Sequence, residues 1–437
     1  MRAFRQRAAG VDAIADRIED KIIQYRRDFH RHAESGWTEF RTASLVARRL
    51  ADLGFDVRLG QEVLRKEDRM GLPSPNLLEE AWRRASEQGG DPEYLDPIRG
   101  GYTGVAGILR RGSGPTVALR FDMDALGVVE TKDPAHRPLQ EGFASVNEGV
   151  MHACGHDGHT AIGLGVAEVL AELQTDLSGT VKLVFQPAEE GVRGAKAMVG
   201  AGVMDGVSLL LSLHLFSGWD LGEFDPGHGR FLATTKFDAR FLGSAAHAGG
   251  RPNEGKNAML AAATAVLNLQ AISRHNDGVT RINVGRLQAG TGRNVIPARA
   301  LLEIETRGAT TELNDYVYGR AVEILEGAAA MQGCDLEITA MGSAQSATGD
   351  AELARRVEEI AAEMGGFSLR PLEEGGGSED LTYMMNWVQE QGGLATAIGL
   401  GADLGGWGHH TSEFDFDERA LKMAVRLQAM IVLDLLD

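Results

Sequence analysis

A ten-residue run, Met151–Thr160, holds a thiol, three imidazoles and a carboxylate directly before an apolar helical repeat. Thiol and imidazole groups are the donors that borderline metal ions prefer, and the start of a helix fixes where such side chains point. The run therefore indicates a metal site that includes Cys154 and His156. His152 and His159 are interpreted as supporting or structural side chains rather than ligands.

Further polar groups follow strand-like runs far along the chain. They are Asp122 and Asp124 after 116–121, Glu189 and Glu190 after 180–185, His214 after 208–213, and His409 and His410 after the Gly-rich stretch 405–408. In open α/β sheets, ligands bind outside the carboxyl ends of the strands, so these groups should converge. The donors of this set are Cys154, His156, Glu190, His214 and one of His409 and His410.

This donor set is large enough for two metal ions that share a bridging ligand. Glu189 stands next to the ligand Glu190, which suits a general base that takes a proton from a metal-activated water. The same carboxylate can pass the proton to a leaving amine. The chemistry indicated is metal-assisted hydrolysis.

Each piece also has a simpler interpretation. Glu189 and Glu190 could lie on a solvated face, His214 could be a core histidine, and the Asp122 and Asp124 pair could cap a strand. A structural zinc module in 151–159 is a further alternative, although such sites are usually rich in Cys and this run has one. The combination favours the active-site interpretation, because each strand end supplies a group that the others lack.

Composition limits the class of protein. The chain has 437 residues, which favours two domains, and a net charge of −18, which argues against nucleic acid and anionic membranes as partners. The apolar runs are too short to span a bilayer, and 1–20 lacks an apolar signal core, so we expect a cytoplasmic protein. The second cysteine, Cys334, is interpreted as a small buried side chain.

Hydrophobic patterning predicts an α/β fold in the first domain. Two helices are expected within 11–53, with a turn at 33–36, and a polar helical insertion at 61–98. Strands and helices then alternate, which indicates parallel strands with helical crossovers. The expected strands are 103–109, 116–121, 180–185 and 208–213, the helices 160–173 and 194–201, and the returning tail has elements at 350–364, 381–389, 395–398 and 417–436.

The pattern changes near Gly229 to the order βαββαβ, a ferredoxin-like motif that can close on itself. Its expected elements are 232–242, 257–274, 279–287, 300–306, 311–331 and 335–341. We therefore expect a first domain from 1–229 and 343–437, and an inserted domain at 230–342.

Five segments together resemble the dinuclear metallo-amidohydrolases, a family that includes hippurate and auxin-conjugate hydrolases. They are DMDAL at 122–126, MHACGHD at 151–157, FQPAEEG at 185–191, AHA at 246–248 and GRNVIP at 292–297. RDFH at 27–30, the insertion, ETRG at 305–308 and GSED at 377–380 are most similar to the subgroup of aminobenzoyl-glutamate and indole-acetyl-aspartate hydrolases. The resemblance covers nearly the whole chain.

The resemblance implies a zinc-peptidase-like α/β/α catalytic domain with an inserted dimerisation or lid domain. The metal ligands it implies are Cys154, His156, Glu190, His214 and His410, which selects His410 over His409. Glu189 is implied as the general base, and Asp124 as an aspartate that orients a ligand. Two divalent ions are implied, manganese before zinc.

In the inserted domain, the resemblance implies that His247 reaches the active site of a partner protomer and stabilises the oxyanion. Asn294 is implied to contact the substrate, and Arg307, or more weakly Arg293, to clamp a substrate carboxylate. An ion pair of Arg307 with Glu303 or Glu305 is the alternative for that side chain.

The function expected is amide hydrolysis of N-aroyl or N-arylacetyl conjugates of glutamate or aspartate, of the p-aminobenzoyl-glutamate type. Indole-3-acetyl-aspartate is the alternative substrate. An alternative of another class is one component of a hetero-oligomeric hydrolase, with little activity alone. The partner is expected to be a second copy or a related chain.

Overall fold

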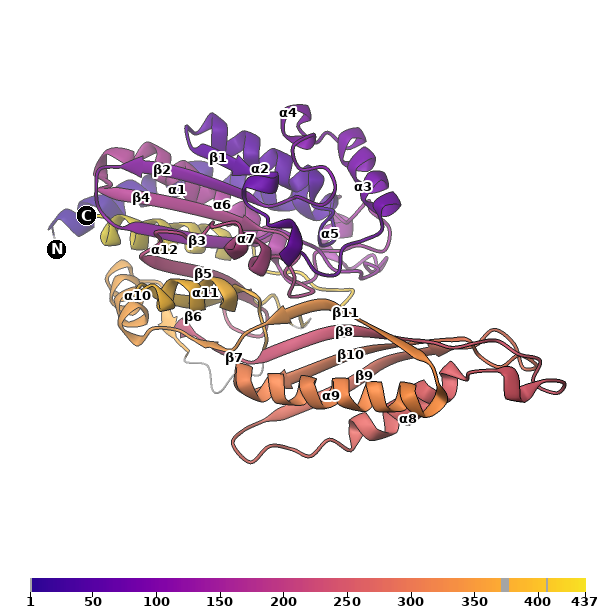
Figure 1. The fold of residues 1–437 in the computed structure, drawn as a ribbon. Coiled ribbons are helices and arrows are strands. Elements are labelled where there is room, and N and C mark those ends of the chain that lie inside the picture. Colours follow the sequence, from indigo (N-terminus) through magenta and orange to yellow (C-terminus); the bar gives the residue numbers. More distant parts are fainter. Residues whose placement is uncertain (1, 371–376, 406–407) are drawn as a thin grey trace. The chain divides into compact units, whose positions relative to one another are not determined.

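The computed structural model describes residues 2–370, 377–405 and 408–437, and the chain divides into two compact units (Figure 1). Unit 1 contains Met1–Gly229, Thr348–Gly375 and Tyr383–Asp437, and unit 2 contains Arg230–Ala347 and Gly376–Thr382. The predicted ranges differ from this division at 343–347 and at Gly376–Thr382, which group with unit 2. Residues 406–407 of the expected Gly-rich loop lie outside the described residues.

Unit 1 is built on an eight-stranded sheet with the order β1-β2-β4-β3-β5-β14-β6-β13. The strands are β1 (Asp56–Leu59), β2 (Val105–Arg111), β3 (Thr116–Asp122), β4 (Gly179–Gln186), β5 (Leu209–Phe216), β6 (Glu223–His228), β13 (Ser368–Leu369) and β14 (Leu394–Gly401). Strands β3, β4, β5 and β14 run parallel, which confirms the predicted crossovers. Their carboxyl ends therefore share one edge of the sheet.

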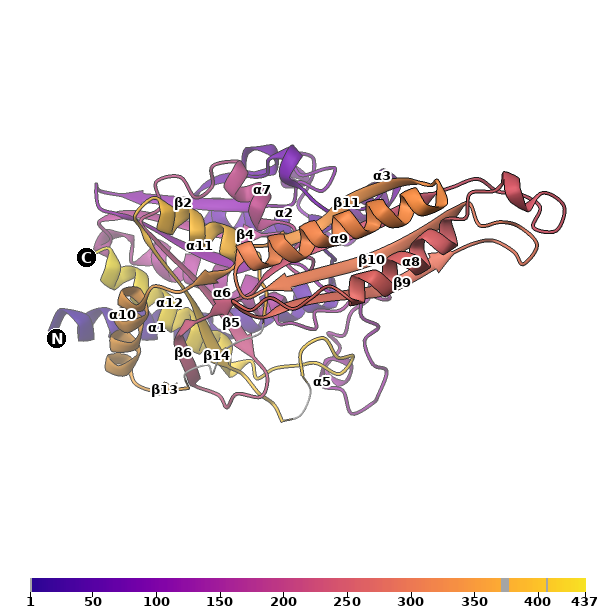
Figure 2. The same cartoon turned by 60° about the horizontal axis from the view of Figure 1, so that its bottom comes forward.

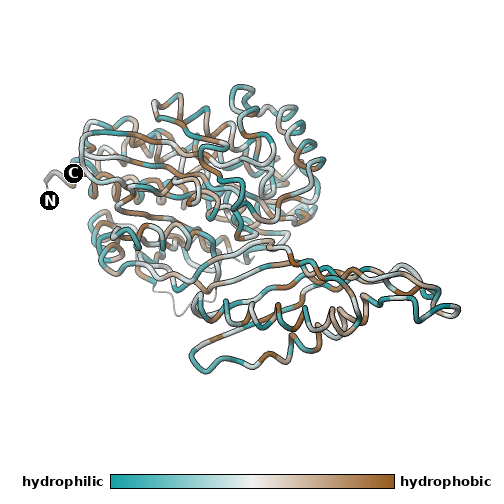
Figure 3. The backbone as a smooth tube through the Cα atoms, in the orientation of Figure 1, coloured by the Kyte–Doolittle hydropathy of each residue, from teal (hydrophilic) through white to brown (hydrophobic). Residues whose placement is uncertain are grey.

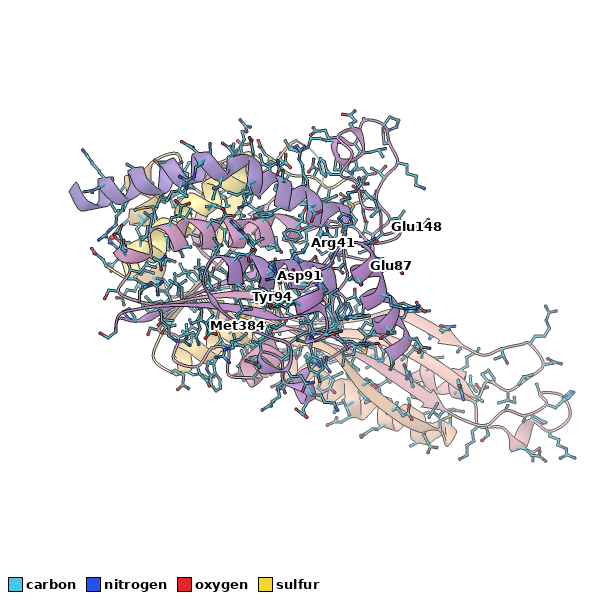
Figure 4. All side chains as sticks on the ribbon, turned by 90° about the horizontal axis from the view of Figure 1, so that it is seen from above. Arg41, Glu87, Asp91, Tyr94, Glu148 and Met384 are labelled. Carbon is cyan, nitrogen blue, oxygen red and sulfur yellow. The ribbon has the colours of Figure 1, made fainter. Side chains whose placement is uncertain are left out.

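The helices of unit 1 are α1 (Arg2–Arg31), α2 (Phe40–Asp52), α3 (Pro75–Glu87), α4 (Pro92–Leu95), α5 (Arg137–Gln140), α6 (His156–Glu172), α7 (Ala195–Gly200), α10 (Ala351–Met364), α11 (Leu381–Glu390) and α12 (Arg419–Leu435). Helices α1, α6 and α12 pack together, and α6 lies on β3, β4 and β5. Met384 of α11 lies on the other side of the sheet from α1 (Figure 4). The unit is thus layered α/β/α.

Small residues bring α6 close to its neighbours. A Cβ on Gly163 would lie 2.7 Å from Phe185 Cε1, and one on Gly165 would lie 2.7 Å from Val425 Cγ2. Both distances are too short for a real side chain, so glycine allows the helix to sit directly on the sheet and on α12. This contact fixes the N-terminus of α6, where His156 stands.

The insertion at 61–98 is held to the rest of unit 1. It contains the short helices η1 (Gly60–Glu62) and η2 (Lys66–Asp68) besides α3 and α4. The Arg65 amide donates to Ala197 O at 2.9 Å, and Arg193 Nη1 donates to Gly71 O at 3.1 Å. The insertion therefore supports the segment that follows Glu189 and Glu190.

Unit 2 has the element order β8 (Ala233–Leu242), α8 (Ala258–Gln270), β9 (Thr280–Ala289), β10 (Arg299–Gly308), α9 (Thr311–Gln332) and β11 (Asp335–Ala344). The antiparallel sheet order β11-β8-β10-β9 confirms the ferredoxin-like prediction. Both helices cover one face (Figure 2), and Phe237, Phe241, Leu302 and Leu325 lie buried in the core between the layers.

Two short strands, β7 (Arg230–Phe231) and β12 (Ala347–Thr348), form a separate pair. Hydrophobic stretches lie along the strands and helices, and many loops are hydrophilic (Figure 3). Within the described ranges, no helix is both long and apolar enough to cross a membrane.

Candidate metal centre and active site

The run at 151–160 forms a tight turn into α6. Gly155 has a φ of 92°, in the left-handed region that favours glycine, and His156 is the first helical residue. The turn leaves Cys154 Sγ 3.6 Å from His214 Nε2. His214 lies inside β5 and not after its end, so the predicted strand was too short.

Potential ligand atoms gather here in four overlapping groups, each within 4.8 Å. They are Cys154, His156 and His214; Cys154, Glu190 and His410; His156, Glu189 and Glu190; and Asp122, His156 and His159. All five sequence-predicted ligands belong to the first three groups, although they come from the start of α6, β5 and two loops. The structure thus brings together side chains that are up to 256 positions apart, from Cys154 to His410.

Backbone carbonyls set the orientation of two imidazoles. His156 Nδ1 lies 2.8 Å from Asp124 O, and His214 Nδ1 lies 2.7 Å from Leu215 O. A carbonyl only accepts, so each Nδ1 carries the proton and each Nε2 keeps its lone pair for the cluster. Metal-binding histidines are typically oriented in this way.

Two buried atoms of the cluster suit a cation. His156 Nε2 and Glu190 Oε1 are 3.8 Å apart and have no hydrogen-bond partner among the described residues. Buried polar atoms are normally satisfied, so this pair fits groups that would coordinate a divalent ion. Burial also raises the pKa of Glu190 to about 7 and the pKa of the Cys154 thiol well above its ordinary value.

The segment that carries Glu189 and Glu190 is held by Asp124. Its Oδ1 accepts from the Glu189 amide at 2.8 Å and its Oδ2 from the Glu190 amide at 3.1 Å. Ala188 and Val192 flank the pair with φ values of 55° and 54°, which are uncommon for residues other than glycine. The backbone is therefore bent sharply, so that both carboxylates face His156 at 3.8 to 3.9 Å.

The group of Asp122, His156 and His159 is less suited to a metal. His159 Nδ1 lies 2.6 Å from Asp122 Oδ1, and its Nε2 accepts from the Leu215 amide at 2.9 Å. Asp122 also accepts from Arg120 at 2.5 Å. Because both nitrogens of His159 are engaged, its geometry matches the structural role expected from the sequence.

The two adjacent histidines differ in surroundings. His410 Nε2 lies 3.5 Å from Glu190 Oε2. His409 Nε2 instead accepts from the Ser217 amide at 3.2 Å, and burial lowers the pKa of His409 to about 4. Among the described residues, the candidate groups thus include His410 and omit His409.

A buried ion cluster beneath the site was not foreseen from the sequence. Arg26 is fully buried and donates to Asp157 at 2.8 Å, to Asp415 at 2.7 Å and to Glu418 at 3.2 Å. The cluster joins α1 to the start of α6 and to the chain after His410. The one clue in the sequence was that Arg26 stands on the apolar side of a long predicted helix. Without its distant partners, such an arginine is easily taken for an ordinary surface residue.

The remaining sequence-predicted residues lie in unit 2. His247 Nδ1 accepts from the Gly250 amide at 3.0 Å, so its proton is on Nε2, which suits a donor to an oxyanion. The Ala248 amide donates to Asn294 O at 3.1 Å, which places Asn294 beside this histidine. Arg293, next to Asn294, is exposed.

Arg307 is engaged by the competing ion pair. Its Nε and Nη2 each lie 3.1 Å from a carboxylate oxygen of Glu305. Glu303, the other alternative, pairs with Arg286 at 2.8 Å. A substrate carboxylate at Arg307 would have to share the guanidinium with Glu305 or displace it.

An α/β/α unit with Cys, His and Glu side chains gathered near the carboxyl ends of parallel strands is the arrangement expected of a metal-dependent hydrolase. Residues 118–434 match Peptidase family M20/M25/M40, and the chain belongs to this family. It is thereby a hydrolase that acts on amide bonds.

Several relatives match nearly the full chain, and two of them are especially similar to it. Indole-3-acetyl-aspartic acid hydrolase of Enterobacter agglomerans is 49% identical over 417 residues, 95% of each chain. One of the subunits of p-aminobenzoyl-glutamate hydrolase from Escherichia coli is 48% identical over 420 residues, 95% of this chain and 96% of that one.

Solved structures agree with the fold. An aminobenzoyl-glutamate utilization protein from Klebsiella pneumoniae has a TM-score of 0.85 at 42% identity, covering 97% of this chain and 98% of its own. A dinuclear metal binding peptidase of the M20 family from Bacillus subtilis has a TM-score of 0.67 at 26% identity, covering 96% and 99%. The predicted fold class and family are confirmed.

Proposed function

We propose that the chain is a metal-dependent amidohydrolase that cleaves p-aminobenzoyl-glutamate-type conjugates, with unit 1 as its catalytic domain. The observation that carries this proposal is the unsatisfied pair His156 Nε2 and Glu190 Oε1 inside a cluster of potential ligands. The two nearly full-length relatives support the substrate class, because both are named for the hydrolysis of an aryl conjugate of an acidic amino acid.

The proposed ligands are Cys154, His156, Glu190, His214 and His410. When bound, two divalent ions, manganese before zinc, would polarise the scissile carbonyl and lower the pKa of a nearby water. Cys154 acts as a ligand and not as a nucleophile, so we expect no acyl-enzyme. The dinuclear relative from Bacillus subtilis supports the count of two ions.

Glu189 is the proposed general base. Its carboxylate takes a proton from the attacking water as the new C–O bond forms. It then gives that proton to the amide nitrogen as the C–N bond breaks, which releases the amino acid as a neutral amine. Asp124 positions this carboxylate through the Glu189 amide.

Unit 2 is the proposed dimerisation or lid domain. His247 Nε2–H is the proposed donor to the oxyanion in the site of a partner protomer, and Asn294 the proposed substrate contact. Arg307 and, secondarily, Arg293 are proposed to bind the carboxylate of glutamate or aspartate. The assembly is proposed to be a homodimer or a heterodimer with a related chain, in the cytoplasm.

Indole-3-acetyl-aspartate is the second candidate substrate, because the relative named for it is as similar to this chain as the aminobenzoyl-glutamate relative. Dependence on a second, different chain is the candidate of another class, since the aminobenzoyl-glutamate relative is named as a subunit.

A release assay over a small panel tests these proposals. The purified chain, stripped with a chelator and reloaded with Mn²⁺, is given p-aminobenzoyl-glutamate, indole-3-acetyl-aspartate and hippurate. We expect the highest kcat/KM on p-aminobenzoyl-glutamate, and we expect no hydrolysis of any conjugate by the metal-free chain. Preference for indole-3-acetyl-aspartate would select the second substrate, and no release from any of the three would favour dependence on a second chain.

A further inference from the structure

A third buried carboxyl, that of Glu39, contacts the segment that carries Glu189. Glu39 directly precedes α2 and is fully buried. Its Oε1 accepts from the Ala188 amide at 2.8 Å, and its Oε2 accepts from Thr103 Oγ1 at 2.6 Å. Neither the ligand set nor the proposed acid–base chemistry uses this group.

The contact is made at a residue with an uncommon backbone conformation. Ala188 has a φ of 55°, a conformation that residues with a Cβ rarely adopt, so its surroundings must hold it there. With the two amides bound by Asp124, three consecutive backbone N–H groups at 188–190 are held by two buried carboxyls. The direction of the Glu189 side chain follows from this backbone.

The segment around Gly36 leaves little room for another backbone conformation at Ala188. A Cβ on Gly36 would lie 3.0 Å from both Cα and Cβ of Ala188, so the segment before Glu39 packs directly on this residue. The Ala188 carbonyl accepts from the Arg193 amide at 3.1 Å, which closes the turn on its other side.

Glu39 can do this without a charge. Burial, with the nearby Asp124 carboxylate, raises the pKa of Glu39 to about 8. In the neutral form the carbonyl oxygen still accepts from the Ala188 amide, and the hydrogen bond with Thr103 reverses, so that the carboxyl O–H donates to Thr103 Oγ1. A glutamine has the same shape and the same pair of functions.

We propose that Glu39 is a positioning residue for amide hydrolysis: it holds Ala188 in its left-handed conformation and so aims the Glu189 carboxylate at the site. This inference rests on the proposed function of Glu189. It assigns to Glu39 no contact with substrate or metal.

Glu34 offers a matched control five positions away. It is equally buried and also accepts two backbone amides, from Arg41 and Thr42, each at 2.9 Å. Those amides belong to the first turn of α2 and not to the segment at 188–190. Loss of either carboxyl should destabilise the fold, but loss of Glu34 should leave the geometry of Glu189 unchanged.

The test compares Glu39→Met, Glu39→Gln and Glu34→Met with the native chain, all at measured and equal metal content. A displacement of about 1 Å at a catalytic group costs about 100-fold in rate, so we expect Glu39→Met to lose about that factor in kcat with KM changed less than about 3-fold. Glu39→Gln should stay within about 3-fold of native, and Glu34→Met should lower Tm while keeping kcat per folded molecule.

A second readout needs neither substrate nor metal. In the metal-free protein, hydrogen–deuterium exchange should become faster in a peptide covering 186–193 for Glu39→Met, and in one covering 40–43 for Glu34→Met. If Glu39→Met does not fold, Glu39→Asp, one methylene too short to reach the Ala188 amide, is expected to show the same exchange pattern and the same direction in kcat.

A kcat for Glu39→Met within about 3-fold of native, or unchanged exchange at 186–193, would overturn the inference. Equal losses of kcat in Glu39→Met and Glu34→Met would overturn it too, since a general loss of stability would then explain both. A native chain that hydrolyses no conjugate is the distinct failure of the proposed function, and the exchange comparison still decides whether Glu39 holds the segment.

Discussion

Asp124 and Glu189 are joined by a hydrogen bond of 2.8 Å from the Glu189 amide to the Asp124 carboxylate, across 65 positions of sequence. The other oxygen of the same carboxylate accepts the next amide, and the Asp124 backbone carbonyl accepts from His156 Nδ1 at 2.8 Å. One residue just after β3 therefore orients both the proposed base and a proposed ligand.

Replacement of Asp124 by Asn should weaken both metal binding and catalysis. An Asn amide can accept only through its oxygen, so its NH₂ group would face one of the two backbone amides that the carboxylate now binds. We expect metal affinity and kcat each to fall about 10- to 100-fold, the usual effect of removing a group that orients a ligand. Titration with Mn²⁺ and steady-state kinetics measure the two effects, and a variant that is native in both would contradict this role.

His409 and His410 form a matched pair for testing the ligand set. His410→Ala should remove a ligand, so we expect its Mn²⁺ content to fall from two ions per chain towards one. His409→Ala should keep both ions, because His409 Nε2 is bound to the Ser217 amide. Metal analysis after gel filtration gives the count. Loss of an ion in His409→Ala with full loading of His410→Ala would reverse the assignment.

The proposed clamp at Arg307 predicts selectivity for acidic conjugates. A hydrogen-bonded charge contributes about 1.5–3 kcal/mol, so Arg307→Ala should raise KM for p-aminobenzoyl-glutamate about 10- to 100-fold. Its KM for hippurate, which lacks the side-chain carboxylate, should rise less. Arg286→Ala is the control, since Arg286 forms a comparable ion pair with Glu303 on the same sheet. Equal effects of Arg307→Ala on both substrates would argue against recognition of the side chain.

Glu130 should make stability depend on acid pH. Although burial opposes ionisation, hydrogen bonds with His136, His30 and the Ser145 amide lower the pKa of Glu130 to about 2 from an ordinary value of 4.5. A lowered carboxyl pKa stabilises the fold above the unfolded value, and this stabilisation is lost as pH falls from about 4.5 through about 2.

Urea unfolding from pH 7 to pH 2 measures this dependence. Glu130→Gln should lower the free energy of unfolding by about 2 kcal/mol at pH 7, with the difference from native shrinking below pH 4.5. The exposed Glu148→Gln variant should change little. A difference for Glu130→Gln that stays constant down to pH 2 would contradict the lowered pKa.

Features that depend on residue type and on the local hydrophobic pattern could be predicted from the sequence. The alternation of strands and helices predicted the parallel sheet, and the order βαββαβ predicted unit 2. The gathering of Cys154, Glu190 and His214 was predictable, because residues near the carboxyl ends of parallel strands converge. Their role as metal ligands stays a prediction.

Features that depend on distant packing were not predictable. In the sequence, Glu39 resembles an ordinary residue at the start of α2, and Arg26 resembles an exposed residue of α1. Their partners, Ala188 for Glu39 and Asp157 for Arg26, lie more than 100 positions away. The short strands β6 and β13 and the grouping of Gly376–Thr382 with unit 2 likewise depend on tertiary contacts that no local pattern encodes.

The central claim is that Glu189 performs acid–base chemistry beside a metal centre. Its most direct test is the kcat of Glu189→Ala on p-aminobenzoyl-glutamate, measured with Mn²⁺ content equal to that of the native chain. We predict a loss of about a thousand-fold with two ions still bound. Native turnover by the fully loaded Glu189→Ala protein would contradict the claim.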